Sequence, residues 1–296
     1  MRKNHKSGHL QAFDVVNNTL LLLVALICVY PFLYVLFVSC SDGMELARGT
    51  VTFLPKGFQV RSFEYIFANP RFNVGTGLLN SFLYTAGGTA VSLIVTYITA
   101  YVLSRKRFVH RNWIMRLFVI TWVFDAGIIP QYIIYSKLGY VDNPWVMIIP
   151  GAINTQFLLI ARTFLAGIPD ELEEAAFIDG ANDLTILTQV FLPLSSTILA
   201  TVGTFYAVSI WNQYLVPQIY LKSENLKTIQ QVLKNVVITD GSSGTTFRNV
   251  TVDGVTLNQY NLKPAAIFIT MLPIVCVYPF VQKYFKKGVL LGSVKG

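Results

Sequence analysis

Long stretches without charged residues dominate this sequence. No Asp, Glu, Lys or Arg occurs between Asp14 and Asp42, and a helix of about 20 apolar residues is enough to cross about 30 Å of hydrocarbon. Further uncharged stretches that meet or approach this length cover residues 72–104, 143–161, 184–221 and 264–282. Charged residues make up only 13% of the chain, against about a quarter in soluble proteins. The pattern therefore argues against a soluble protein and indicates one that folds in a bilayer.

Residues 113–135 form a further candidate span, although Arg116 and Asp125 interrupt it. Polar residues of this kind persist in a membrane helix where they face protein or water rather than lipid. We therefore predict an all-α integral membrane protein with six transmembrane helices. The expected spans cover about residues 15–38, 78–102, 113–135, 144–165, 195–220 and 264–282.

Three blocks of basic residues predict the orientation of the chain. Lys and Arg concentrate in cytoplasmic loops near the ends of spans, and they occur here before the first span, between the second and third, and after the sixth. Six crossings place all three blocks on one side, so we expect residues 1–14 and the C-terminus to be cytoplasmic. Residues 42–71, 136–143 and 222–263 then form the outer loops.

The sequence contains no pattern typical of a catalytic, metal or nucleotide site. Cys28, Cys40 and Cys276 have no Cys-x-x-Cys or Cys/His spacing, and no GxxxxGK[ST] phosphate-binding loop occurs. The net charge of +8 comes from short blocks between neutral stretches, which is typical of membrane anchoring rather than of nucleic-acid binding. We expect a non-enzymatic chain that contacts the lipid bilayer and binds no metal, cofactor or nucleic acid.

The loop between the fourth and fifth spans is the one predicted cytoplasmic segment that is acidic rather than basic. Asp170 follows a proline and precedes Glu173 by three residues, a spacing that predicts a capping box at the start of a short helix. Leu172, Ala175 and Ala176 would share one face of this helix. Gly180 would end it before a second amphipathic piece that runs to Pro193. The residues alone predict a helix-turn-helix that docks another protein, and the alternative is a solvated linker.

The same loop carries a resemblance to a known family. Residues 174–176 read Glu-Ala-Ala, residues 179–181 read Asp-Gly-Ala and residues 190–193 read Val-Phe-Leu-Pro, which is similar to the EAA motif of bacterial ABC importer permeases. Gly-Ile-Ile-Pro at 127–130, Trp-Asn-Gln-Tyr at 211–214 and the C-terminal residues 278–285 and 292–296 also resemble the carbohydrate-type, MalG-like permeases, in particular their LplC-type branch. Asp125 departs from the family pattern, in which a neutral residue would be expected.

The resemblance implies a type I importer permease domain over residues 15–296 with a coupling loop at 169–193. It implies that this loop docks into an ATPase subunit through residues Glu173, Glu174, Ala175, Ala176, Asp179, Gly180 and Ala181. The implied partners are a second permease, two ATP-binding subunits that hold ATP and Mg, and an extracytoplasmic sugar-binding protein. The implied location is the bacterial cytoplasmic membrane.

A few polar residues within the spans are candidates for the substrate pathway. They are Asp125, Asn154, Gln156, Trp211 and Asn212, which offer hydrogen-bonding groups or an aromatic plane suited to a sugar. Packing between helices uses the same amide and aromatic residue types, and the alternative for Asp125 is a place near the outer interface or a protonated, neutral carboxyl. Both interpretations stay open. Arg162 is expected to extend to the lipid headgroups. The resemblance and the positive net charge favour an oligosaccharide that contains uronates, such as a pectin or alginate fragment, and the alternative function is a secondary transporter for a small polar solute.

Overall fold

The computed structural model describes residues 8–70, 72–238, 250–252 and 254–292, with side chains described over 13–70, 72–236, 250–252 and 254–279. The chain forms two compact units. Residues 1–72 and 233–271 belong to the first, and residues 73–232 and 272–296 belong to the second.

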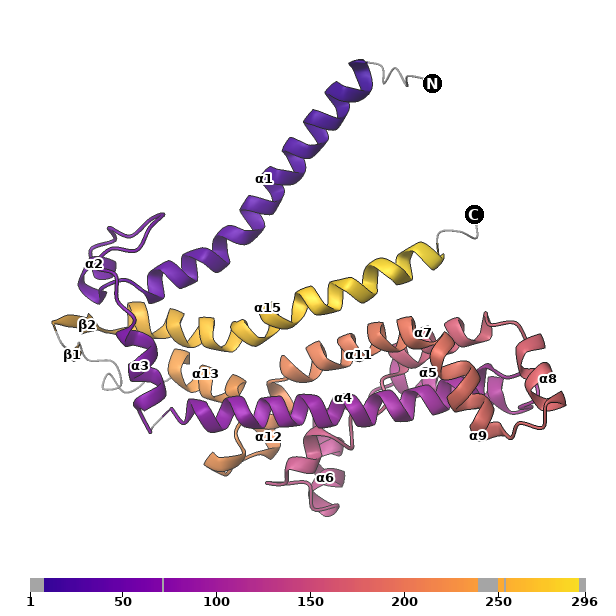
Figure 1. The fold of residues 1–296 in the computed structure, drawn as a ribbon. Coiled ribbons are helices and arrows are strands. Elements are labelled where there is room, and N and C mark those ends of the chain that lie inside the picture. The colour runs from indigo at the N-terminus through magenta and orange to yellow at the C-terminus, as the bar shows by residue number, and fades with distance from the viewer. Residues whose placement is uncertain (1–7, 71, 239–249, 253, 293–296) are drawn as a thin grey trace. The chain divides into compact units, whose positions relative to one another are not determined.

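The first unit contains a long apolar helix followed by a small folded cap. Helix α1 (Gly8–Ser39) carries an uncharged, strongly apolar segment from Val15 to its end, and most of its described side chains are exposed. This exposure suits a helix surrounded by lipid. The cap contains α2 (Gly43–Ala47), α3 (Arg61–Ala68), β1 (Val250–Val252), β2 (Val255–Leu257) and the start of α15 (Gln259–Gly292) (Figure 1). Strands β1 and β2 are antiparallel, with Thr251 opposite Thr256.

Buried amide side chains hold the cap together. Gln59 is 5% exposed, and its Nε2 donates to the carbonyl oxygens of Ser39 and Ser41 at 3.0 and 3.1 Å. Asn261 Nδ2 donates to the carbonyl oxygens of Ser41 and Thr256. Because a buried carbonyl without a donor is costly, these amides satisfy the chain where it leaves α1. The predicted outer loop 42–71 is therefore a packed structure in the described residues.

The second unit is built around α4 (Val74–Ser104), which packs against α7 (Thr155–Ala166) and α11 (Ser196–Trp211) (Figure 1). Small residues let α4 and α11 approach closely. A Cβ added at Gly203 would lie 2.9 Å from Leu93 Cδ1, and one added at Gly88 would lie 2.9 Å from Ile210 Cδ1. Contacts of this kind replace the hydrophobic effect as the main source of helix association in lipid.

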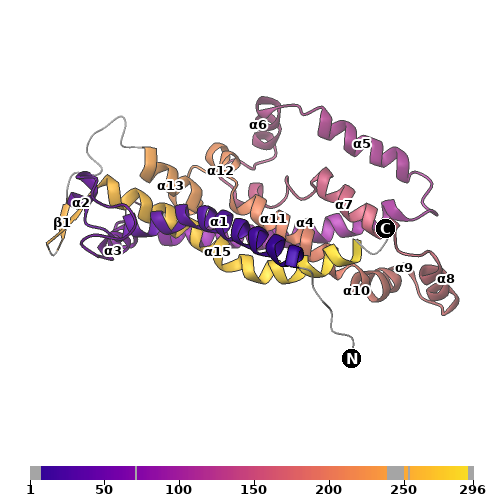
Figure 2. The same cartoon turned by 90° about the horizontal axis from the view of Figure 1, so that it is seen from above.

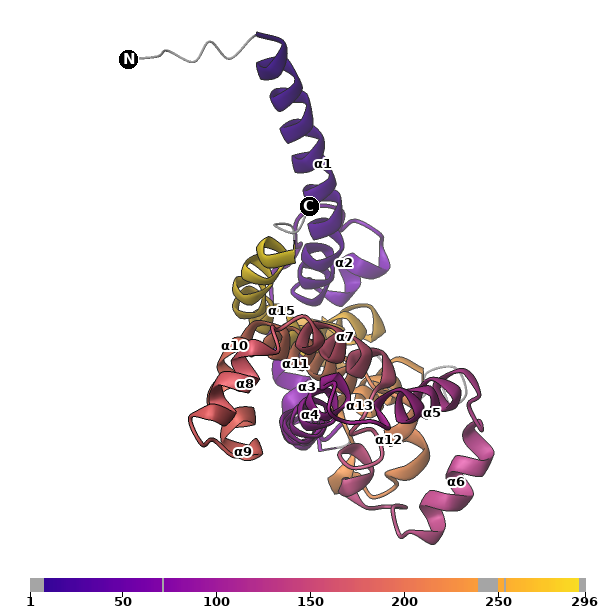
Figure 3. The same ribbon diagram turned by 90° about the vertical axis from the view of Figure 1, so that its right-hand side faces the viewer.

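Shorter elements surround these three helices. Figure 3 shows α8 (Glu171–Ile178), α9 (Asp183–Thr185) and α10 (Leu192–Leu194) on one side of α4, and α5 (Arg111–Val123) and α6 (Ile128–Lys137) on the other. A π-helical stretch, η2 (Ile186–Phe191), joins α9 to α10. The remaining elements are η1 (Pro144–Met147), α12 (Leu215–Tyr220), η3 (Glu224–Leu226) and α13 (Ile229–Ile238), the last of which begins in this unit.

Three described helices are long and apolar enough to cross a membrane by themselves, at Phe13–Ser39, Val74–Ser104 and Gln259–Pro279. They agree with the predicted spans 15–38, 78–102 and 264–282. Two bent helix pairs meet the same criteria jointly, which gives up to five spans. The count of six stays a prediction.

The residues of the other three predicted spans do not form continuous helices, and whether each crosses the membrane stays a prediction. Residues 113–135 are divided between α5 and α6, which meet at 113° around Gly127 at φ +81° (Figure 2). Only Thr155–Ala166 of the predicted span 144–165 is α-helical, because Asn154 caps a new helix there. The predicted span 195–220 is interrupted after Trp211. Gly127 precedes α6, Asn154 caps the start of α7 and Asn212 follows the end of α11. Hydropathy alone reports none of these boundaries.

Candidate functional site

The acidic loop folds as the predicted helix, break and second helix. Helix α8 ends at Ile178, and Gly180 follows two residues later with a φ of +81°. The N–H of Gly180 donates to the carbonyl of Phe177, and the N–H of Ala181 donates to the carbonyl of Ala176 at 2.9 Å. Asn182 then caps α9, because its Oδ1 accepts a 2.8 Å bond from the N–H of Thr185. This glycine-terminated helix followed by an asparagine cap fixes a sharp reversal of the chain.

The predicted docking residues fall into two groups. Glu174, Ala175, Asp179 and Gly180 are exposed, together with Leu172 and Ile178, which is 88% exposed. Glu173 is buried, while Ala176 and Ala181 pack against the core that includes Leu165 and Phe191. The predicted face of Leu172, Ala175 and Ala176 is therefore divided, since Ala176 faces this chain. The surface open to a partner is formed by the first group.

The predicted capping box between Asp170 and Glu173 is wrong. Asp170 has helical dihedral angles and makes no side-chain capping bond. Its carboxylate instead lies 2.7 Å from Lys106 Nζ. This hydrogen bond lowers the pKa of Asp170 and raises the pKa of Lys106. Asp170 therefore pairs with a basic residue that follows α4 instead of capping α8.

Arg105 is the residue of this site that the sequence interpretation missed. It was grouped with Lys106 and Arg107 as a basic membrane anchor, yet it is only 2% exposed. Its Nη1 lies 3.2 Å from Glu173 Oε2, and its Nη2 donates to the carbonyl oxygen of Leu165. Loss of one partner from such a buried pair costs about 3–5 kcal/mol, because the other charge remains buried. The sequence signal was the presence of a basic and an acidic loop on the same predicted side.

Two neighbouring contacts complete the attachment of the loop. Arg107 pairs with Asp183 at 2.5 Å, and its Nε lies 3.2 Å from Glu173 Oε1 without the alignment of a hydrogen bond. The Tyr97 hydroxyl of α4 donates a 2.7 Å bond to the carbonyl oxygen of Leu187 in η2. π-Helical turns leave carbonyls outside the regular α-helical pattern, so this bond satisfies one of them.

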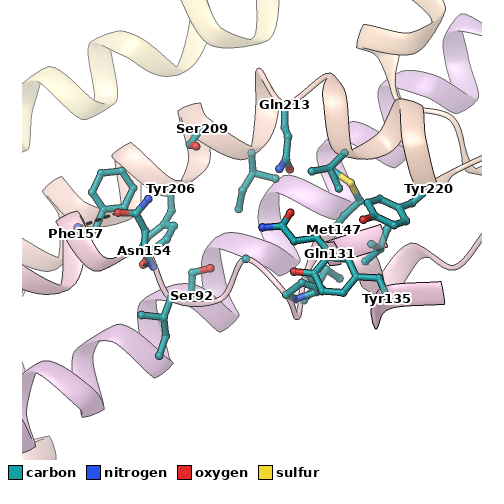
Figure 4. Close-up of a pocket in the computed structure, with 17 residues that line it drawn as sticks. Ser92, Gln131, Tyr135, Met147, Asn154, Phe157, Tyr206, Ser209, Gln213 and Tyr220 are labelled. Atoms are coloured by element: carbon teal, nitrogen blue, oxygen red, sulfur yellow. Dashed lines mark hydrogen bonds between the residues drawn. The ribbon is translucent and has the colours of Figure 1, made fainter. Parts of the chain in front are cut away.

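A pocket of about 280 Å³ lies between α4, α6, α7, α11 and α12 (Figure 4). Its lining side chains carry no formal charge. The polar and aromatic ones are Ser92, Gln131, Tyr135, Asn154, Phe157, Tyr206, Ser209, Gln213 and Tyr220. Amides and hydroxyls donate and accept hydrogen bonds, and aromatic rings offer flat apolar faces. The lining can therefore hold a polyhydroxylated molecule.

Tyr206 fixes one wall of this pocket. Its hydroxyl lies 2.7 Å from Thr96 Oγ1 on α4 and accepts a 2.9 Å bond from the N–H of Asn154. The ring of Phe157 meets the ring of Tyr206 edge-on at 4.8 Å. The side chain of Asn154 also caps α7 through bonds to the N–H groups of Gln156 and Phe157. These bonds couple α4, α7 and α11 at the pocket.

Of the predicted pathway residues, Asn154 alone lines the pocket. Gln156 is exposed outside it, and Trp211 is 7% exposed, with its indole N–H unpaired among the described residues. Asn212 Nδ2 donates to the carbonyl oxygen of Val208. The pocket is instead lined by Gln131, Ser209 and Gln213. The break after Trp211 and the bend before α6 determine which side chains point into it.

Asp125 has a structural position in the break between α5 and α6. Its Oδ1 accepts 3.2 Å bonds from the N–H of Gly127 and from Gln131 Nε2. It does not line the pocket, but it contacts Gln131, which does. Arg162 also differs from expectation, since its Nε donates to the carbonyl oxygen of Leu103 at 2.9 Å rather than extending away from the protein. Both residues satisfy backbone or side-chain groups at helix ends.

The chain is similar to known transport proteins over nearly its whole length. Residues 12–291 match the family model described as binding-protein-dependent transport system inner membrane component. Protein LplC of Bacillus subtilis (strain 168) is 37% identical over 293 residues, which cover 99% of this chain and 97% of that protein. The polygalacturonan/rhamnogalacturonan transport system permease protein YtcP of the same organism is 39% identical over 285 residues, with 96% and 98% covered.

A solved structure shares the fold. A chain in the crystal structure of a bacterial ABC transporter involved in the import of the acidic polysaccharide alginate superposes with a TM-score of 0.83 and is 31% identical. The match covers 96% of this chain and 100% of that chain.

Proposed function

This chain belongs to the family of binding-protein-dependent transport system inner membrane components, and we propose that it forms, with a second permease, the path of an acidic oligosaccharide through an ATP-driven importer. The chain is a membrane-embedded sugar ABC importer permease. The substrate, the paired permease and the cytoplasmic placement of both termini are parts of the proposal.

The exposed surface of the α8 turn is the observation that carries the docking part of the proposal. Leu172 and Ile178 are apolar side chains that are 43% and 88% exposed beside the exposed carboxylate of Glu174. Apolar side chains with a charged rim are typical of protein contacts. One of two ATP-binding subunits, which hold ATP and Mg, would receive this surface. The exposed residues Leu172, Glu174, Ala175, Ile178, Asp179 and Gly180 would make the contact, while Glu173 would hold α8 in place from behind.

The pocket supports a sugar as the transported molecule. Its lining combines the amides of Gln131, Asn154 and Gln213 with tyrosine and phenylalanine rings and has no charged side chain. Neutral donors can bind both the hydroxyls and the carboxylates of a uronate without holding it as tightly as an ion pair would. Release remains possible, which a transport path requires. The uronate polymers in the names of YtcP and the alginate importer favour this class.

The proposed cycle follows from these two sites. ATP binding would draw the two ATPases together and move the docked α8 turns with them. The attached helices would change from an inward-open to an outward-open arrangement as rigid bodies. An extracytoplasmic sugar-binding protein would then release its ligand into the opened path.

Purification of the tagged chain from its native membrane tests the proposal. We expect a second permease and ATP-binding subunits to co-purify, and the complex in liposomes to hydrolyse ATP faster when its binding protein carries trigalacturonate. Maltotriose is the matched neutral control of equal length. Uptake that is driven by an ion gradient without ATP would contradict the importer and support a secondary transporter. Equal stimulation by both sugars would contradict only the proposal that the substrate is acidic, and would leave the importer proposal intact.

A further inference from the structure

Arg105 joins four elements of the second unit at one buried point. It directly follows Ser104, the last residue of α4, and its Nε donates to Ser104 Oγ at 3.0 Å. Its guanidinium contacts Glu173 on α8 and the carbonyl oxygen of Leu165 near the end of α7. The same group lies 4.5 Å from the ring centre of Phe191 in η2. A planar guanidinium can serve several partners in fixed directions, whereas a lysine ammonium has no such geometry.

The burial of this pair indicates a role other than stability. Replacing both members of a buried ion pair by apolar residues of similar volume is often neutral or stabilising for a protein, because the desolvation of two charges offsets their attraction. A pair that only filled space could therefore be apolar. The Arg105–Glu173 pair, in contrast, fixes the direction of α8 relative to the end of α4.

Helix α4 connects this point to the pocket. Ser92 on α4 lines the pocket, and Thr96 on α4 contacts Tyr206, which forms its wall. Arg105 follows Ser92 by thirteen positions, and a helix rises about 1.5 Å per residue. The Tyr97 bond to Leu187 and the Arg107 pair with Asp183 attach the second half of the loop to the same region. A displacement of α8 that α4 follows would therefore reach the pocket.

We propose that Arg105 is a positioning residue that transmits the movement of the docking loop to α4 and hence to the substrate pocket. This inference rests on the proposed function. It assigns no contact with an ATPase to Arg105, which is buried against its own chain. Its role is to make α8 and α4 move as one body.

The decisive variant replaces both charges, Arg105→Met with Glu173→Leu. The pair is then apolar and of similar volume, so the fold is retained, but the directional bonds to α8 and to the Leu165 carbonyl are lost. We expect the ATPase subunits to co-purify and ATP hydrolysis to stay within about twofold of wild type, while sugar transported per ATP falls about tenfold. A purely structural role predicts that the double variant transports as well as wild type, and that result would overturn the inference.

A matched control and a second measurement separate the possible causes of failure. Arg61→Met with Glu64→Leu makes the same replacement at an exposed ion pair of 2.8 Å in the cap, and it should leave transport per ATP unchanged. Spin labels at Ile178 and Ile94, both exposed, report the α8–α4 distance without any transport assay. We expect one narrow distance distribution in wild type and a broad one in Arg105→Lys, which keeps the positive charge but loses the planar guanidinium. An unchanged distance distribution in Arg105→Lys would contradict the inference even if Arg105→Met/Glu173→Leu failed to fold. If no ATP-binding subunits co-purify with the wild-type chain, that result would contradict only the proposed function.

Discussion

At the scale of a single residue, Gly180 makes the reversal of the loop at residues 169–193 possible. Its φ of +81° is a conformation that side chains disfavour, and an added Cβ would meet no atom within 4 Å. The cost of a substitution is therefore backbone strain, about 1–2 kcal/mol for an L-residue, rather than a steric clash. We expect Gly180→Val to reduce transport and co-purification of the ATPase while membrane insertion stays normal.

Gly180→Asn is the control for this prediction, because asparagine tolerates the left-handed conformation better than a β-branched residue. It should retain most of the transport. Undiminished assembly and transport in Gly180→Val would show that the turn is not needed for docking.

The hydrogen bonds to the Asp142 carboxylate predict that the stability of the protein depends on pH. It lies at φ 55°, and its Oδ1 accepts bonds from the N–H groups of Lys222 and Ser223 at 3.0 and 2.8 Å. The hydrogen bonds from Ser223, first that of its hydroxyl, lower the pKa of Asp142 below its ordinary value of 3.8. A depressed carboxyl pKa adds stability above the unfolded-state pKa, and this stability is lost as pH falls through the folded pKa.

We therefore expect wild type to be more heat-stable than Asp142→Asn at pH 7, because asparagine tolerates the backbone conformation but is a weaker acceptor. The difference should shrink as the pH is lowered from about 5 through the folded pKa. Thermal unfolding of both proteins in detergent across this pH range measures it. A difference that stays constant with pH would show that the charge of Asp142 does not hold residues 222 and 223.

At the scale of elements, the break between α5 and α6 determines what Asp125 does. The carboxylate holds the N–H of Gly127 and the amide of Gln131, and an asparagine oxygen can accept the same bonds. We expect Asp125→Asn to transport trigalacturonate and maltotriose in the same ratio as wild type. Uptake of both sugars by both proteins tests this, and a selective loss of the charged sugar would place Asp125 on the pathway.

The Gln131 side chain supplies the comparison for that measurement. It contacts Asp125 and also lines the pocket, so Gln131→Ala removes a pocket amide without changing a charge. Its transport of both sugars should fall, whereas Asp125→Asn should leave both unchanged. Similar losses in the two variants would show that Asp125 acts through the position of Gln131.

The element scale also shows what the sequence could predict and what it could not. Charge-free length located α1, α4 and α15, and the Gly180 break was predicted correctly because a glycine turn is a local property. The breaks at Gly127 and after Trp211 lie inside apolar stretches, where hydropathy has no signal. The pairing of Arg105 with Glu173 depends on the tertiary contact between two loops. Local sequence predicts neither the partner nor the burial.

The lining of the pocket between α4, α6, α7, α11 and α12 was predicted least well for the same reason. Asn154 was identified, but Gln131, Ser209 and Gln213 converge with it only after α6, α11 and α12 change direction. Candidate polar residues could be selected by type, whereas their orientation required the helix ends. Trp211 and Asn212 illustrate this, since one is buried and the other bonds its own helix while their neighbour Gln213 reaches the pocket.

At the scale of the whole molecule, the three basic blocks predict which side of the membrane each unit's loops face. Arg105, Lys106 and Arg107 hold the loop at residues 169–193 through its acids, so part of this block has a structural role in addition to its predicted role in membrane orientation. The other two blocks lie largely outside the described side chains. The orientation therefore needs a test that uses several independent positions.

We expect cysteines introduced at Val109 and Ile178, which are 84% and 88% exposed, to resist an impermeant thiol reagent in intact cells. Cysteines at Ala47, which is exposed in the cap, and at Ser243, which lies outside the described residues, should react. The native Cys28 and Cys276 are exposed and Cys40 is buried, so all three are first replaced by alanine to remove background labelling. Permeabilised cells that lack the ATP-binding subunits are the control, because Val109 and the then uncovered Ile178 should react as well. The expected result follows because basic blocks lie on the cytoplasmic side. Labelling at Val109 and Ile178 but not at Ala47 in intact cells would reverse the predicted orientation. The loop at residues 169–193 would then lie on the side without ATP-binding subunits.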